Sequence, residues 1–156
     1  MRDDEFERLY AEEAAGLFSF LAYRTGDRAL AEDLLADAFE RALRGRYNPR
    51  RGSAKTWLYS IALNALRDHL RRAAAEGRAY ERVPNAPAGD PFADLEARDE
   101  LTRGLARLSA QEREAISLRY GAGLTVPEMA TVLGEPITTV EGRVYRALRR
   151  LREALG

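Results

Sequence analysis

The segment spanning residues 124–155 carries the signals of two helices with a glycine turn between them. Thr125 and Glu128 have the spacing of a capping box, and Pro127 lies in the first turn, where its missing N–H costs nothing. Gly134 follows, and glycine tolerates the left-handed backbone that a sharp helix exit requires. The sequence therefore predicts a short helix, a tight turn and a second helix.

The second helix combines a predicted buried stripe with a cationic face. Its apolar residues recur every three or four positions, at Ile137, Val140, Val144, Leu148, Leu151 and Leu155. Its arginines lie mostly off this stripe, at Arg143, Arg146, Arg149, Arg150 and Arg152. Such a helix is commonly a solvated surface helix. The caps and the short turn instead favour a helix-turn-helix that places its second helix in the major groove of DNA.

Composition excludes several classes of protein. The 156 residues include 46% hydrophobic residues, enough for packed cores, but no apolar run long enough to cross a membrane. The first residues, MRDDEFER, lack the apolar region of a signal peptide. Cysteine is absent and His69 is the single histidine, so we expect no disulfide, no metal site and no cofactor. These features indicate a cytoplasmic protein that is not an enzyme.

The formal net charge of zero hides a strong segregation of charge. Residues 1–40 carry 4 basic and 11 acidic side chains, whereas residues 41–82 carry 11 basic and 3 acidic ones. Residues 83–100 are again acidic, with 1 basic against 5 acidic, and residues 101–156 are basic, with 9 against 6. This pattern predicts two kinds of partner, a basic protein surface for the acidic blocks and nucleic acid for the basic blocks.

Residues 76–93 interrupt the helical pattern. They contain three prolines and two glycines, few apolar residues and no periodicity, which is typical of an extended tether. No strand-like alternation is found on either side. The sequence therefore predicts an all-α protein, with a three-helix domain in residues 1–75 and a four-helix domain in residues 94–156, joined by a flexible linker.

Three helices are predicted in the N-terminal domain. The first ends before Gly26, the second begins at an N-capping Asp27, and the third begins near Ser53. The second helix has an apolar face at Leu30, Leu34, Ala38 and Ala42, and a separate acidic stripe at Asp33, Asp37 and Glu40. The third is expected to bury Trp57, Ile61 and Ala65, and to expose Ser60, Asn64, Arg67 and Arg71. Between them, residues 45–52 form a basic, turn-rich loop.

Two further helices are predicted ahead of the helix-turn-helix. One spans residues 94–108, and the next begins at a capping box formed by Ser109 and Glu112 and runs through Tyr120. Short helices of this kind enclose a small core, predicted to contain Leu105, Leu108, Ile116, Leu118, Met129, Val132, Leu133 and Val140.

Three segments in order resemble one family, the bacterial RNA polymerase sigma factors of the extracytoplasmic-function type in the sigma-70 family. AEDLLADAFERAL (31–43) resembles the family's core-binding segment, and GSAKTWLYSIALNALRDHLRR (52–72) resembles the segment that melts and reads the −10 promoter element. Residues 108–152 resemble the domain that reads the −35 element. The resemblance implies a transcription initiation factor whose partners are RNA polymerase core, promoter DNA and an anti-sigma factor, without direct membrane insertion.

The resemblance also implies three sets of site residues. The polymerase-binding set is Asp33, Leu34, Asp37, Phe39 and Glu40. The −10 set is Tyr47, Asn48, Arg50, Arg51, Lys55, Asn64, Arg67 and Arg71. The −35 set is Thr138, Thr139, Glu141, Gly142, Arg143, Tyr145 and Arg146.

Some positions depart from the family pattern or allow two interpretations. Glu141 stands where a basic residue is usual, Gly142 where a serine is usual, and Glu135 replaces an apolar residue. Arg143 can contact DNA or pair within its own domain, and Trp57 is expected in the core rather than as a stacking platform. The alternative function is a helix-turn-helix activator or repressor that binds duplex operators as a dimer.

Overall fold

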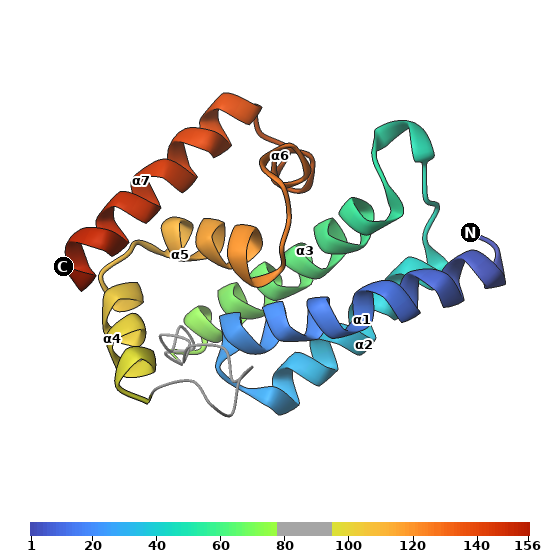
Figure 1. The fold of residues 1–156 in the computed structure, drawn as a ribbon. Helices are drawn as coiled ribbons and strands as arrows, with labels where there is room; N and C mark the ends of the chain where they lie inside the picture. The colour runs from blue at the N-terminus through green and yellow to red at the C-terminus, as the bar shows by residue number, and fades with distance from the viewer. Residues whose placement is uncertain (78–94) are drawn as a thin grey trace.

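The computed structural model describes residues 1–77 and 95–156, and within these ranges every regular element is helical (Figure 1). The N-terminal module contains α1 (Asp3–Thr25), α2 (Arg28–Arg44), the 3₁₀ turn η1 (Pro49–Arg51) and α3 (Ala54–Ala75). The C-terminal module contains α4 (Leu95–Ala106), α5 (Ala110–Ile116), the π-helical turn η2 (Ser117–Gly121), α6 (Val126–Leu133) and α7 (Ile137–Leu155). The all-α fold is confirmed. Beyond Gly77, the linker predicted at 76–93 lies outside the described residues.

The predicted caps set the helix boundaries. Asp27 Oδ1 accepts the Leu30 N–H at 3.2 Å, and Ser53 Oγ accepts the Thr56 N–H at 3.2 Å. Each side chain satisfies a backbone donor that has no partner within its helix. At the end of α1, Gly26 adopts φ 66°, a left-handed conformation that favours glycine.

Both capping boxes in the C-terminal module are complete. Ser109 Oγ accepts the Glu112 N–H at 3.1 Å, while Glu112 Oε1 accepts the Ser109 N–H at 3.0 Å. Thr125 and Glu128 exchange the same two bonds, at 3.2 and 2.9 Å. These contacts begin α5 and α6, each only about two turns long, which local propensity alone does not stabilise.

The helix that follows α5 differs slightly from the prediction. The α-helical hydrogen-bond pattern stops at Ile116, and the chain continues as a π-helical turn to Gly121 rather than as α-helix through Tyr120. The Ala122 N–H bonds the Ser117 carbonyl at 2.8 Å, which closes this wider turn.

The buried face of α3 is not the predicted one. Trp57 and Ile61 are only half-buried, although Ala65 is buried as expected. The fully enclosed side chains are instead Leu58, Tyr59, Ala62, Leu63 and Leu66. Helix α3 packs against α1 and α2 and also against α6. The face that these helices bury is therefore rotated about the helix axis relative to the face predicted from the spacing of apolar residues.

A similar correction applies to α7. Val140 and Val144 are buried as predicted, but Ile137 is 50% exposed and Leu155 is 36% exposed. Ala147 is fully buried in their place. Ile137 and Leu155 are the first and last residues of the helix, whereas Val140, Val144 and Ala147 lie in its middle.

The two modules pack directly against each other. Helix α3 contacts α6, and α1 contacts η2, as the ribbon in Figure 1 illustrates. Leu118, Leu124 and Met129 of the C-terminal module share one buried cluster with Leu17 and Leu58 of the N-terminal module. A smaller cluster brings Tyr23 of α1 together with Leu105, Leu108, Ile116 and Ala147. Among the described helices, none is long and apolar enough to cross a membrane.

Candidate nucleic-acid interface

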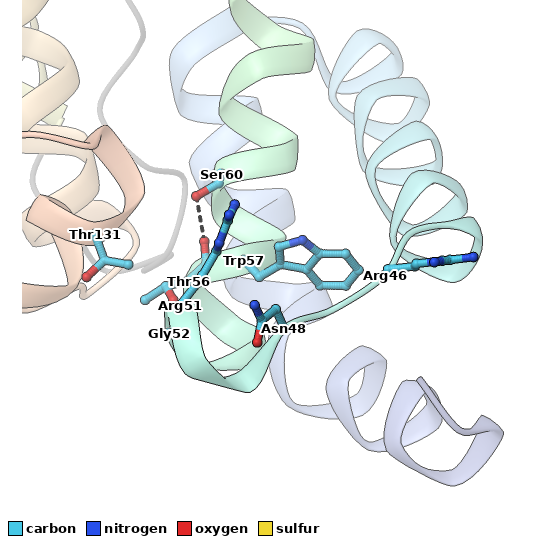
Figure 2. Close-up of a pocket in the computed structure, with 8 residues that line it drawn as sticks. All are labelled: Arg46, Asn48, Arg51, Gly52, Thr56, Trp57, Ser60 and Thr131. Atoms are coloured by element: carbon cyan, nitrogen blue, oxygen red, sulfur yellow. Dashed lines mark hydrogen bonds between the residues drawn. The ribbon is translucent and has the colours of Figure 1, made fainter.

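A cavity of about 560 Å³ opens beside the loop that leads into α3 (Figure 2). Its lining combines one large ring, two arginines and several small polar groups: Arg46, Asn48, Arg51, Gly52, Thr56, Trp57, Ser60 and Thr131. All of these belong to the N-terminal module except Thr131, which stands on α6 across from the others. The cavity therefore lies where the two modules meet.

Local hydrogen bonds hold the loop in shape. Asn48 Oδ1 accepts the Arg50 N–H at 3.0 Å and caps η1, and the Tyr47 hydroxyl donates to the Gly52 carbonyl at 2.9 Å. The Tyr47 ring lies 5.4 Å from the Trp57 ring, tilted by 39°. Asn48 and Tyr47 therefore stabilise the conformation of this loop through hydrogen bonds within it.

Trp57 lies at the edge of the core rather than within it. It is half-buried, packs against Tyr47 on one side and lines the cavity on another. This placement corrects the expectation of a core residue. An aromatic face beside arginines is suited to stacking a base and neutralising its phosphate.

Of the −10 candidates, only Asn48 and Arg51 line this cavity. Asn64 and Arg50 are exposed, and Arg71 pairs with Asp68 toward the far end of α3. Lys55 and Arg67 instead face the C-terminal module, where each meets a carboxylate.

Those two ion pairs cross the junction between the modules. The Arg67 guanidinium lies 2.7 Å from Glu114 Oε1, and the Lys55 ammonium lies 3.7 Å from Glu128 Oε2. Glu114 Oε2 also lies 3.8 Å from the guanidinium of Arg24, a buried residue of α1. The pKa of Glu128 is lowered, first by the Thr125 backbone N–H and then by Lys55.

The predicted polymerase-binding residues fall into two groups. Asp33 and Glu40 are exposed and Asp37 is half-buried, so their carboxylates form an acidic surface on α2. Two bonds within the helix hold part of it in place, Asp37 to Arg41 at 3.1 Å and Glu40 to Arg44 at 2.6 Å.

Leu34 and Phe39 belong to the core instead. They are 7% and 5% exposed, and the Phe39 ring packs on Phe6 at 6.0 Å and on Tyr10 at 4.9 Å. Although the sequence placed both residues in the polymerase-binding set, the structure buries their side chains within the N-terminal module. The large apolar side chain that this helix exposes is Leu43, at 56%.

The −35 candidates lie on the outer side of α7, with one exception. Thr138, Thr139, Glu141, Tyr145 and Arg146 are exposed, and Gly142 is half-exposed. Arg143 donates two hydrogen bonds to Glu135, Nη1 to Oε1 at 3.0 Å and Nη2 to Oε2 at 2.7 Å. Arg143 therefore clamps the turn between α6 and α7. Hydrogen bonding between these two side chains is the largest cause of the lowered pKa of Glu135 and of the raised pKa of Arg143.

Residues absent from the sequence-based sets contribute to these surfaces. Arg46 and Trp57 line the cavity. Arg46 belongs to the loop whose basic, turn-rich composition was visible in the sequence. Arg24 and Glu114 meet across the module junction, and nothing local in the sequence marks either residue.

Comparisons with known proteins agree along most of the chain. The family model for sigma-70 region 2 matches residues 9–76, and the model for sigma-70 region 4 matches residues 98–151. RNA polymerase sigma factor CarQ of Myxococcus xanthus is 34% identical over 158 residues, which cover 98% of this chain and 90% of CarQ. The ECF RNA polymerase sigma factor BldN of Streptomyces coelicolor is 31% identical over 161 residues, covering 97% of this chain but 61% of BldN.

Solved structures give the same match. The sigma factor RpoE from Bartonella quintana, in complex with the anti-sigma factor NepR, superposes with a TM-score of 0.77 at 27% identity, covering 97% of both chains. CnrH in complex with the cytosolic domain of CnrY gives a TM-score of 0.70 at 27% identity, covering 99% of this chain and 89% of CnrH. On these grounds the chain belongs to the sigma-70 family of promoter-recognising RNA polymerase sigma factors, within its extracytoplasmic-function type.

Proposed function

We propose that this sigma factor divides promoter recognition between the cavity beside Trp57 and the outer side of α7. The cavity receives an unpaired base of the −10 element, and α7 reads the −35 element as duplex. The factor works in the cytoplasm without chemistry of its own, because RNA synthesis belongs to the polymerase.

The single observation that carries this proposal is the composition of the cavity. Opening duplex DNA costs about 1–2 kcal/mol per base step. A factor that uses no ATP offsets this cost only by binding the separated strand, and stacking on an aromatic side chain contributes about 1–3 kcal/mol per base. Trp57 offers such a ring, with Arg46 and Arg51 at the same cavity to neutralise phosphate.

The −35 assignment rests on exposure and position. Thr139, Tyr145 and Arg146 project from the face of α7 that the rest of the module leaves open. Hydroxyl and guanidinium groups are donors for base edges and phosphates in the major groove. Glu141 lies on the same exposed part of the helix, where a carboxylate repels phosphate but accepts from cytosine N4.

Two protein partners complete the proposal. The carboxylates of Asp33, Asp37 and Glu40 on the surface of α2 dock on a basic surface of the polymerase core, while the buried side chains of Leu34 and Phe39 hold α2 in position. An anti-sigma factor controls the chain, by analogy with the structurally similar RpoE, which was solved with the anti-sigma factor NepR.

The experiment is transcription with sigma-free polymerase core and genomic DNA fragments. Wild type is expected to give defined transcript starts, with unpaired thymines near −10 detected by permanganate. Trp57→Ala is expected to lower the yield of melted complexes by about tenfold, because one stacked base is lost. Trp57→Phe keeps a ring and is expected to restore part of this yield.

Charge is tested in parallel with a matched control. Arg46→Ala combined with Arg51→Ala is compared with Arg2→Ala combined with Arg8→Ala, which removes the same charge from exposed positions in or next to α1. Only the first pair is expected to reduce melting. If no starts appear and the protein shifts duplex DNA by itself, the operator-binding alternative holds instead.

A further inference from the structure

The arginines of α7 differ in whether a carboxylate holds them. Three of them are held: Arg143 by Glu135 at 2.7 Å, Arg150 by Glu112 at 3.0 Å and Arg149 by Glu153 at 3.5 Å. Arg146 is exposed, and among the described residues its side chain has neither an ion-pair nor a hydrogen-bond partner. Its guanidinium is therefore available to a partner outside the chain.

A neighbouring glycine sets where this guanidinium lies. A methyl group placed on Gly142 would lie 3.1 Å from Arg146 Nη1, 3.8 Å from Cζ and 3.9 Å from Nη2. The Arg146 side chain thus leans back by one turn, as long side chains on helices do, and its guanidinium covers the bare backbone of Gly142. We call this contact the glycine seat.

The backbone gives no other reason for glycine at this position. Gly142 lies inside α7 and its φ is not positive, whereas Gly134 ends α6 at φ 65°. Glycine inside a helix destabilises that helix relative to alanine. A serine is usual here in the family pattern, so the seat is a feature of this chain. What glycine provides at this position is the space that Arg146 occupies.

We propose that Gly142 is a positioning residue that directs the Arg146 guanidinium toward one guanine of the −35 element. The inference deepens the proposed −35 function and rests on it. A guanidinium donates two hydrogen bonds to guanine O6 and N7, which is the commonest specific contact in the major groove. Such a pair depends on the direction of its donors, and an arginine already held in one direction loses less rotamer freedom on binding.

A side chain added at position 142 separates the direction of the guanidinium from its charge. The distance of 3.1 Å is shorter than the roughly 3.5 Å at which non-bonded heavy atoms pack, so Gly142→Ala pushes the guanidinium off its seat. The positive charge stays on the outer side of α7. Attraction to phosphates therefore persists, whereas the hydrogen bonds to guanine are weakened.

The test uses holoenzyme assembled from polymerase core and the full-length chain. The probe is a promoter duplex taken from upstream of a transcript start that wild type produces. In a series of probes, each guanine near −35 is replaced in turn by 7-deazaguanine, which keeps base pairing and O6 but lacks the N7 acceptor. The measured quantity is the ratio of the dissociation constants for modified and unmodified duplex.

Wild type is expected to bind about tenfold more weakly when one particular guanine is modified, because one of the two Arg146 bonds is lost. For Gly142→Ala this ratio is expected to fall to about twofold, while the dependence of log affinity on log salt stays as in wild type. The matched control is Gly121→Ala, which adds the same methyl group where nothing lies within 4 Å of it, and which should keep the wild-type ratio. An unchanged ratio in Gly142→Ala would overturn the inference.

A double-mutant cycle on the unmodified duplex shows whether Gly142 acts through Arg146. Gly142→Ala alone is expected to weaken binding about fivefold, and to have no further effect when Arg146→Ala is already present. Arg146→Ala alone is expected to remove the sensitivity to 7-deazaguanine and to lower the salt slope by about one unit. A full effect of Gly142→Ala in the Arg146→Ala background would contradict a role through this arginine.

Thermal unfolding of the free chain separates positioning from a change of fold. Gly142→Ala is expected to raise Tm by about 2–4 °C, because alanine favours the helix. A lower Tm together with weaker discrimination would assign the defect to the fold and overturn the inference.

Arg146→Ala also identifies which proposal has failed. If this variant leaves both affinity and salt slope unchanged, Arg146 does not contact the −35 element, and the proposed reading by this part of α7 fails together with the inference. If Arg146→Ala weakens binding, but no guanine is sensitive in wild type or Gly142→Ala keeps the wild-type ratio, only the glycine seat is refuted.

Discussion

At the scale of single residues, Glu135 determines what Arg143 can do. It follows the glycine that ends α6 and accepts both guanidinium bonds, at 3.0 and 2.7 Å. The Arg143 side chain is only 16% exposed as a result. Arg143 thus clamps the turn between α6 and α7, and we propose that the contact with DNA falls to its exposed neighbours Thr139, Tyr145 and Arg146.

Replacing Glu135 with glutamine is expected to lower the free energy of unfolding by about 1 kcal/mol at neutral pH, because a charge-assisted pair is lost. Arg143 lowers the folded-state pKa of Glu135 below its usual 4.5. The carboxylate therefore stabilises the fold fully above that value, and this contribution disappears as the pH falls through the lower folded pKa.

Chemical denaturation at neutral pH and at about pH 2 tests this linkage. The difference between wild type and Glu135→Gln is expected at neutral pH and should vanish in acid. Glu153→Gln, an exposed site with a partner one turn away on the same helix, should change little at either pH. A difference that persists in acid would show that the ionised pair does not stabilise the turn.

At the scale of elements, α7 packs against the rest of the C-terminal module on one side and is proposed to contact −35 DNA on the other. Its inner side packs on α4, α5 and α6, and Arg150 binds Glu112 at the start of α5 at 3.0 Å. Its outer side is exposed and polar from Thr138 to Arg146. Because the inner side is fixed by packing, a change of charge on the outer side is expected to alter DNA binding without altering the fold.

Glu141→Lys is accordingly expected to raise affinity for −35 duplex DNA and to steepen the dependence of log affinity on log salt by about one unit. The reason is that a repelling carboxylate becomes a phosphate-neutralising cation. Glu153→Lys makes the same change near the far end of α7 and is expected to have a smaller effect. Equal effects of the two substitutions would place Glu141 away from the DNA.

At the scale of the whole molecule, packing between modules determines the behaviour of the free chain. Leu118, Leu124 and Met129 share a buried cluster with side chains of α1 and α3, so apolar contacts hold the arrangement within which the ion pairs form. Burial in one continuous core couples the two modules energetically.

Thermal unfolding of the free chain is therefore expected to be a single transition. Trp57 is the only tryptophan, so its fluorescence reports on the N-terminal module, whereas far-ultraviolet circular dichroism reports on all helices. The two signals should change with the same midpoint. Separate midpoints would show that the shared cluster does not couple the modules.

The sequence by itself determined the helices, their caps and the order of the modules. Asp27, Ser53, Ser109 and Thr125 each bind a backbone group three residues away, and Gly134 ends α6 through its own backbone conformation. Such signals act within about one turn of chain, so they can be read without knowledge of the fold. The resemblance to sigma factors likewise rested on local sequence segments, three of which follow one another in the family's order.

Only the tertiary structure decided which side chains face one another. Arg67 and Glu114 are 47 residues apart in the chain, and nothing near either one specifies the other. The burial of Phe39 and the half-exposure of Trp57 follow in the same way from how helices pack, since periodicity gives the apolar side of a helix but not the neighbours that cover it. The packing of the C-terminal module on α3 brings Glu114 of α5 to Arg67 and Glu128 of α6 to Lys55. Two cations that the sequence assigned to DNA are therefore paired with carboxylates, because charges interact strongly with opposite charges a few ångströms away.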